Sequence, residues 1–249
     1  MAVKSALRVF EIMECLAEVD DGLTVKELSD ELRFPQSSTF NLVQTMVESG
    51  YLLQTADKRY KLGPKFIYIG TCALKSIDLP KEAKPYLEKL MNRVGETVFM
   101  AVLSGNELMY IAKVDSHRSI KTSAEIGSRK PLYCTGLGKA LLTFIADDKR
   151  EELLNRIEMK AITHKTITNR DEMLRQIEQF KKQGFAIDDE EGEEGLFCYA
   201  APVYNANGEV EAAISVAGPK DRIRKNGDET VKHLLETSKA ISERLGYFK

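Results

Sequence analysis

The sequence has few of the residues from which catalytic and metal centres are built. It holds four cysteines and three histidines in 249 residues. The cysteines form no CxxC pair and no Cys/His cluster, so we expect no structural zinc site. The motifs GxSxG and HExxH are absent, and no histidine has a cysteine or aspartate at motif spacing. The sequence therefore predicts neither hydrolytic nor metal-dependent chemistry, and no cofactor.

Long apolar runs are also missing. No stretch approaches the roughly 18 apolar residues that a membrane-spanning helix needs, and the first residues do not resemble a signal peptide. We therefore expect a cytoplasmic protein without a membrane partner. With 43% hydrophobic residues, the chain can bury a sizeable core, and its length favours two domains.

A net positive charge, the usual mark of a nucleic-acid-binding protein, is absent, because the formal net charge is -2. The charge is unevenly distributed along the first quarter of the chain. Residues 1–32 hold three basic and eight acidic side chains, whereas residues 33–65 hold five basic and two acidic ones. The second segment is compatible with phosphate contact, although a solvated face would have the same composition.

Three helices are predicted in the first quarter of the chain. Apolar residues between Ser5 and Val19 recur at helical spacing, and "TVKE" at 24–27 has the form of a capping box that begins a second, short helix. A third helix begins at Pro35 and stops at Gly50. The last two helices are joined by a tight turn, which is the helix-turn-helix arrangement.

The third helix has a polar face with almost no charge. Helical projection places Ser37, Ser38, Asn41 and Gln44 on this face, and it places Thr39, Phe40 and their apolar neighbours on the other. Hydroxyl and amide groups can read base edges in the major groove, whereas a helix that only faces water usually carries Lys and Glu. The pattern therefore favours DNA recognition over a solvated helix.

Two short strands after Gly50 predict a β-hairpin, or wing, with Lys58 and Arg59 at its tip. Such cations can meet the sugar-phosphate backbone. We expect a winged helix-turn-helix domain over 1–64, a linker helix over 65–79 and a second domain over 80–249. The candidate DNA contacts are Ser37, Ser38, Thr39, Phe40, Asn41, Gln44, Lys58 and Arg59.

The second domain is predicted to be α+β, with helices packed on an antiparallel sheet, as in domains that hold a small molecule. A hairpin turns at Gly105 and Asn106, and a closing helix spans 228–245. Further strands are expected at 119–124, 185–188, 197–204 and 209–218, and further helices at 135–144, 147–158 and 170–184.

The segment "CTGLGKALL" is the strongest candidate for a binding site. It lacks the GxxxxGK[ST] spacing of a phosphate loop, but Thr135 can cap a helix whose first turn contains Gly136 and Gly138. A ligand could approach these glycines closely, and the helix N-terminus would favour a carboxylate. Tight packing of the helix on the sheet explains the glycines equally well. The acidic run at 188–195 is interpreted as a solvated loop.

Taken together, the chain resembles the IclR family of bacterial transcriptional regulators. The resemblance spans most of the chain and rests on segments in the family's order and spacing: "SALRVFEIMECL", "TVKELSDELRFPQSSTFNLVQTMVESGYL", "YKLGPKFIYIG", "IGSRKPLYCTGLGKALL", "QGFAIDDEEGEEGLFCYAAPVYNANGEVEAAISVAGP" and "LLETSKAISERLG". It implies a winged helix that binds palindromic operator DNA as a homodimer or homotetramer, and a GAF-like C-terminal domain that binds a small, often acidic, effector.

The resemblance also implies the effector-binding residues. Ala217 stands where some members have a second serine, and Asn41 stands where the family often has arginine, so adenine is expected in place of guanine at that base. Asp188 would accept a hydrogen bond from a ligand hydroxyl or be protonated itself. The implied effector-binding residues are Gly136, Leu137, Asp188, Cys198 and Ser215.

Two functions from different classes follow. The first is a transcriptional regulator, with repression favoured over activation, whose operator affinity depends on a carboxylate-bearing metabolite. The second is a cytoplasmic enzyme that uses Cys198 as nucleophile and Asp188 as acid or base. The enzyme lacks a histidine at catalytic spacing from the thiol, so the regulator is the favoured prediction.

Overall fold

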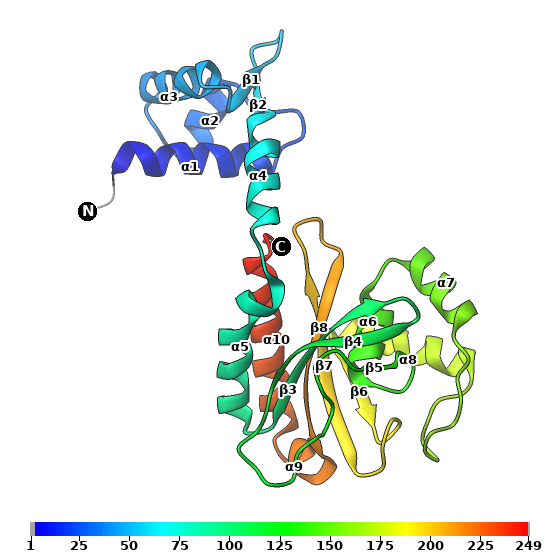
Figure 1. Ribbon diagram of the computed structural model, residues 1–249. Coiled ribbons are helices and arrows are strands. Elements are labelled where there is room, and N and C mark those ends of the chain that lie inside the picture. The colour runs from blue at the N-terminus through cyan, green and yellow to red at the C-terminus, as the bar shows by residue number, and fades with distance from the viewer. Residues whose placement is uncertain (1–2, 249) are drawn as a thin grey trace. The chain divides into compact units, whose positions relative to one another are not determined.

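The computed structural model describes residues 3–248 and contains two compact units, which divide between Ile77 and Asp78 (Figure 1). The predicted fold class, a winged helix-turn-helix followed by helices on an antiparallel sheet, is confirmed. No helix among the described residues is long and apolar enough to cross a membrane.

The first unit consists of helices around a small core, with a two-stranded sheet at one end. Its core side chains are Ile12, Leu16, Leu28, Val43, Met46, Leu52 and Tyr60. Its elements are α1 (Lys4–Ala17), α2 (Val25–Leu32), α3 (Gln36–Glu48), β1 (Leu52–Gln54), β2 (Tyr60–Leu62) and α4 (Lys65–Lys75).

Local sequence signals explain where these helices begin and end. The capping box is present: the Thr24 hydroxyl accepts from the Glu27 N–H at 3.2 Å, and the Glu27 carboxylate accepts from the Thr24 N–H at 2.7 Å. Arg33 ends α2 in the left-handed conformation, with φ at 54°. This turn directs the chain into α3, with Pro35 just before the first helical residue.

The second unit contains a six-stranded antiparallel sheet in the order β5-β4-β3-β8-β7-β6. Strands β3 and β8 lie at its centre and are buried along most of their length. The strands are β3 (Thr97–Ser104), β4 (Glu107–Val114), β5 (Arg129–Pro131), β6 (Ala186–Asp189), β7 (Leu196–Tyr204) and β8 (Val210–Pro219).

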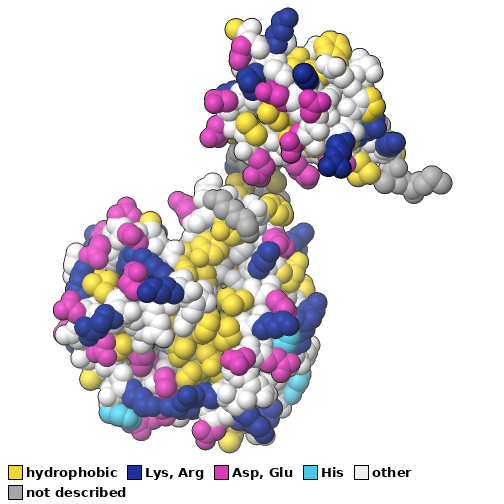
Figure 2. Space-filling view, turned by 180° about the vertical axis from the view of Figure 1, so that it is seen from behind, with side chains coloured by type: hydrophobic (Ala, Val, Ile, Leu, Met, Phe, Trp, Pro, Cys, Tyr) yellow, Lys and Arg dark blue, Asp and Glu magenta, His cyan; other side chains and the backbone are white. Residues whose placement is uncertain are grey.

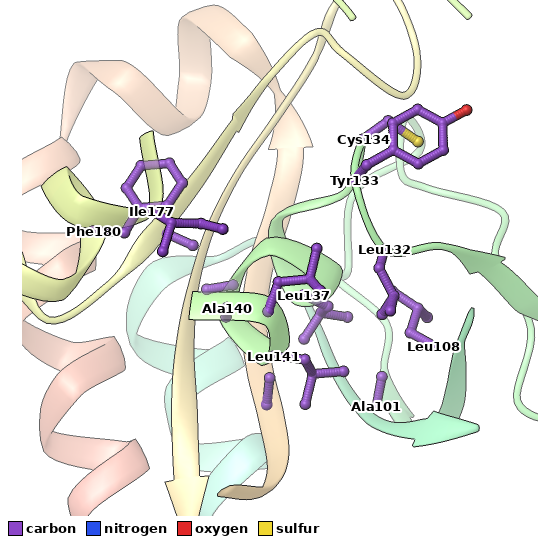
Figure 3. Close-up of a cluster of buried hydrophobic side chains, with 14 of the residues drawn as sticks. Ala101, Leu108, Leu132, Tyr133, Cys134, Leu137, Ala140, Leu141, Ile177 and Phe180 are labelled. Carbon is purple, nitrogen blue, oxygen red and sulfur yellow. The ribbon is translucent and has the colours of Figure 1, made fainter. Parts of the chain in front are cut away.

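Helices cover both faces of this sheet (Figure 1). Helices α5 and α10 pack on one face, and α6 and α8 pack on the other. Figure 3 shows the second contact, where Leu137 and Leu141 of α6 lie between the strands and the Ile177 and Phe180 side chains of α8. The helices are α5 (Leu79–Val94), α6 (Gly136–Phe144), α7 (Asp147–Arg156), α8 (Arg170–Gln183), α9 (Lys220–Lys225) and α10 (Gly227–Arg244).

Three details differ from the sequence-based prediction. Residues 119–124 form no strand, because this segment pairs with no neighbouring backbone in register. The strand in this region is β5, which pairs with β4 through Leu108 and Lys130. The short helix α9 was not predicted, since it follows β8 without a loop and its six residues offer no helical period.

Candidate DNA-reading face and ligand cavity

The N-terminal end of α3 presents polar side chains, as its sequence predicted. Ser37 and Asn41 are exposed, and Phe40 is 49% exposed, although the projection placed Phe40 on the apolar side. The Thr39 side chain is buried, and its hydroxyl donates to the Pro35 carbonyl at 3.2 Å. Thr39 was among the candidate DNA contacts, but its side chain does not reach the surface of this unit.

Two residues of α3 are tied to neighbouring elements. The Ser38 hydroxyl accepts from the Arg8 guanidinium at 3.1 Å, and that guanidinium lies 4.9 Å from the centre of the Phe34 ring. The Gln44 amide donates to the Tyr60 hydroxyl of the wing at 3.0 Å. Sequence reasoning missed Arg8, because nothing in the sequence links α1 to a residue 30 positions later.

The two cations of the wing lie in different surroundings. Lys58 is exposed at the turn, with φ at 59°. Arg59 is half-buried and bonds the Gly22 carbonyl at 2.8 Å and both carboxylate oxygens of Glu27 at 3.2 Å. Arg59 therefore holds the wing against the start of α2, which leaves Lys58 as the better placed of the two for a phosphate.

Acidic side chains gather in a groove between α1 and α2, and Figure 2 shows many acidic groups on the face of the N-terminal unit drawn there. Its apolar floor includes Cys15, Leu23 and Leu32. This groove would repel phosphate, so DNA is expected to approach the unit from the α3 and wing side. The acidic residues that line it are Glu11, Glu14, Glu18, Glu27, Asp30 and Glu31.

In the second unit a cavity of about 430 Å³ lies between the sheet and the start of α6. This volume is in the range of small-molecule sites, about 300–1,000 Å³. The segment between β4 and β5 contributes further lining residues, among them Thr122 and Ser128. The residues that the sequence predicted for the effector site all line this one cavity: Gly136, Leu137, Asp188, Cys198 and Ser215.

The strand register explains how these residues meet. Asp188 pairs with Cys198, and Cys198 pairs with Ala217, so the three form one row across β6, β7 and β8. Ser215 pairs with Phe99 of β3 in the next row on the same face. Residues two apart on a strand share a face, so both rows point to α6.

The glycines of α6 are required by close packing. A Cβ at Gly136 would lie 2.3 Å from the Cys198 sulfur, and one at Gly138 would lie 2.3 Å from the Leu132 carbonyl oxygen. Of the two explanations left open by the sequence, the structure therefore supports tight packing of the helix on the sheet. The helix N-terminus still borders the cavity through Thr135, Gly136 and Leu137, and Thr135 caps it by accepting from the Gly138 N–H at 3.1 Å.

The acidic run at 188–195 is solvated only at its end, where residues 193–195 are exposed, so the prediction of a solvated loop was wrong for its first half. Asp188 and Glu191 are 2% and 4% exposed. The Glu191 carboxylate forms an ion pair with Lys139 of α6, whose side chain is fully buried. The Glu191 N–H donates to the Asp188 carboxylate at 2.8 Å, so the run folds back onto the helix and borders the cavity with Gly192 and Glu193.

Burial shifts the ionisation of the groups around the cavity. Desolvation raises the pKa of Asp188 to about 7, against the lowering effect of the Glu191 N–H and the Lys139 charge. Desolvation also raises the pKa of the Cys134 thiol to about 12 and raises the pKa of the Cys198 thiol. Both thiols are therefore protonated at neutral pH, and Cys198 lacks the thiolate that a nucleophile requires.

A helix-turn-helix with a wing, joined to a sheet domain with a small-molecule cavity, defines a DNA-binding transcriptional regulator. Residues 5–56 match the family described as "IclR helix-turn-helix domain", and residues 71–243 match "Bacterial transcriptional regulator IclR C-terminal". The chain belongs to the IclR family of transcriptional regulators and is not an enzyme.

Relatives and solved structures agree with this assignment. The chain is 34% identical to the HTH-type transcriptional regulator KdgR of Escherichia coli K12, over 99% of this chain and 94% of KdgR. It is also 34% identical to the transcriptional repressor IclR of the same organism, over 89% and 82% of the two chains. Among solved structures, the Thermotoga maritima IclR is 31% identical with a TM-score of 0.66, covering 98% of this chain and 99% of that one. The Agobacterium tumefaciens repressor BlcR is 25% identical with a TM-score of 0.83, covering 100% and 99%.

Proposed function

We propose that this chain is a repressor that binds operator DNA through α3 and the wing, and that a small carboxylate-bearing metabolite in the cavity changes its affinity for the operator. The observation that carries this proposal is the convergence of all five predicted effector residues on one cavity, described above. Repression is supported by the relatives named as repressors, such as IclR and AllR of E. coli. Such a regulator works in the cytoplasm, where the DNA is.

DNA contact is assigned to the exposed part of α3. Ser37 and Asn41 would meet base edges, because the N-terminal residues of a recognition helix enter the major groove. Asn41 can pair bidentately with adenine. Ser38, Phe40, Gln44 and the wing residues are proposed to position the helix, with Lys58 on the phosphate backbone and Arg59 holding the wing.

The carboxylate is assigned to the start of α6. Gly136 and Leu137 lie at the positive end of the α6 dipole and line the cavity, and the Gly136 N–H also donates to the Cys198 sulfur. At its pKa of about 7, Asp188 is partly protonated under neutral conditions, so it can donate to a ligand oxygen or accept from a ligand hydroxyl. Cys198 and Ser215 would supply weaker polar contacts.

A homo-oligomer is proposed from the surface of α4. No residue of this helix is buried, and four large apolar side chains on it are exposed. Side chains of this kind on one helix are best explained by a second copy of the chain that covers them. Light scattering on the purified protein tests this, and a monomer at micromolar concentration would contradict it. The exposed residues are Ile67, Tyr68, Ile69 and Leu74.

The test of the regulatory function is salt-dependent binding of the full chain to DNA from the region upstream of its own gene, with and without millimolar carboxylic acids. We expect nanomolar affinity for one segment, lost steeply as salt rises, and a change in affinity with at least one acid. An affinity that no acid changes, together with unchanged thermal unfolding, would contradict the effector part of the proposal and leave the DNA-binding part intact.

A further inference from the structure

Three residues with hydroxyl groups line the cavity: Tyr110, Thr122 and Ser215. Tyr110 of β4 is 8% exposed and Ser215 of β8 is 1% exposed, and both side chains border the cavity. The Thr122 hydroxyl, from the segment between β4 and β5, is buried and unpaired. Buried polar groups in folded proteins nearly always have a partner, so the Thr122 hydroxyl, unpaired within residues 3–248, with Tyr110 and Ser215 lining the same cavity, calls for polar groups inside it.

The sheet places two of these hydroxyls on the same face. Tyr110 pairs with Ala101 of β3, and Ser215 pairs with Phe99, two residues away on that strand. The Tyr110 ring packs on the Phe99 ring, with centroids 5.1 Å apart, so the aromatic contact fixes where its hydroxyl lies. Burial raises the pKa of Tyr110, with smaller contributions from Cys198 and Asp188, so its hydroxyl is protonated and available as a donor.

The remaining wall of the cavity combines apolar side chains with charged ones, among them Lys130 and Glu193. Leu137, Ile162, Leu196 and Ala217 contribute hydrocarbon surface. The charged Lys139 and Glu191 side chains form an ion pair through one carboxylate oxygen of Glu191, the other oxygen is buried without a partner among the described residues, and neither residue is among those that line the cavity. A ligand made only of hydrocarbon and one carboxylate bound at the start of α6 would leave the Thr122 hydroxyl without a partner and would offer no hydroxyl group to Tyr110 or Ser215.

We propose that the effector is a hydroxylated carboxylic acid and that Tyr110 is a specificity-determining residue that hydrogen-bonds one of its hydroxyl groups. This inference rests on the proposed effector function of the cavity and narrows it to a chemical class. Ser215 and Thr122 provide further positions for ligand hydroxyls. A site built to bond a hydroxyl discriminates strongly against the analogue that lacks it, because its own polar groups then stay buried and unpaired.

The test compares matched acids on the full-length protein. Aldonic acids of three to six carbons are each paired with the unsubstituted fatty acid of the same length, and both are titrated calorimetrically. We expect at least one aldonic acid to bind more than about tenfold tighter than its fatty-acid partner. Fatty acids that bind as tightly as the aldonic acids would overturn the inference and leave the effector site standing. If neither kind of acid binds, the proposed function of the cavity fails with it.

Two tyrosine variants distinguish a specific role of the Tyr110 hydroxyl in ligand binding from the effect of removing any tyrosine hydroxyl. Tyr110→Phe is expected to weaken the aldonic acid by about 3- to 10-fold and to leave the fatty acid unchanged. Tyr204→Phe is the matched control, since Tyr204 lies on β7 but does not line the cavity, and it should leave both affinities unchanged. Equal affinities for wild type and Tyr110→Phe, with unchanged thermal unfolding of both, would remove Tyr110 from the proposal.

Discussion

The Cys198 thiol fills the space that a side chain at position 136 would need, since a Cβ on Gly136 would lie 2.3 Å from the sulfur. Gly136 therefore sets the distance between α6 and β7. Replacing it with a bulky residue would disturb the packing of the whole cavity wall, so such a variant reports on folding as well as on ligand binding.

A double-variant experiment tests this contact. Gly136→Ala alone should lower the free energy of unfolding by about 1–3 kcal/mol, because the added methyl group overpacks the core. Combining it with Cys198→Ala should recover much of that loss, since the sulfur is removed. Urea unfolding of the single and double variants gives the coupling energy, and purely additive losses would show that the two side chains do not compete for this space.

Because the Lys139–Glu191 ion pair is buried, removing one charge should destabilise the protein far more than removing both. Lys139→Met leaves the Glu191 carboxylate buried without its cation, which should cost about 3–5 kcal/mol. Lys139→Met with Glu191→Leu removes both charges and should be close to wild type in stability. Urea unfolding checks this, and a single variant as stable as the double one would mean that water reaches the pair.

The raised pKa of Asp188 predicts a pH dependence of stability. The folded pKa of about 7 lies above the ordinary value of 3.8, so the folded state holds a proton that the unfolded state has lost between these values. The contribution of Asp188 is therefore fully present below pH 3.8 and is lost as pH rises through about 7. Relative to Asp188→Asn, wild type should lose roughly 1.4 kcal/mol per pH unit in this window. If the free energies of unfolding of the two proteins changed in parallel with pH, the raised pKa of Asp188 would be contradicted.

The wing predicts different roles for neighbouring cations. Lys58→Ala should weaken binding to all DNA sequences alike and reduce the slope of log K against log salt by about 1, as expected for one lost phosphate contact. Arg59→Ala removes the bonds to Glu27 and Gly22 and should act mainly on thermal stability of the N-terminal unit. Fluorescence-anisotropy titrations of DNA with both variants at several salt concentrations test these roles. An unchanged salt slope for Lys58→Ala would count against a phosphate contact by Lys58.

Much of the fold could be predicted from local sequence signals. The capping box at Thr24, the glycine turn at Gly105 and the apolar runs of β7 and β8 are signals that lie within a few residues of one another. The strand predicted at 119–124 was wrong because an alternating local pattern does not show whether a partner strand lies beside it, and this segment has none.

The cavity was harder to predict because its chemistry depends on residues far apart in the chain. Lys139 and Glu191 are 52 positions apart, and neither residue type signals burial in a sequence. The run at 188–195 has the composition of a solvated loop, and only the ion pair with α6 explains why part of it is buried. Tyr110 joins the cavity through strand register, which alternation alone does not specify.

Strands β7 and β8 have no solvated face along most of their length. One face carries Cys198 and Ser215 toward the cavity, and the other packs against α10, which in turn packs against α5. A single layer of backbone therefore separates a bound molecule from the long helix α10. Because interiors are densely packed, a strand displaced by an occupant has no empty space to move into on its far side. The helices on that side must shift with the strand. Ligand binding in the cavity is therefore expected to displace α5, the first element after the boundary between the two units.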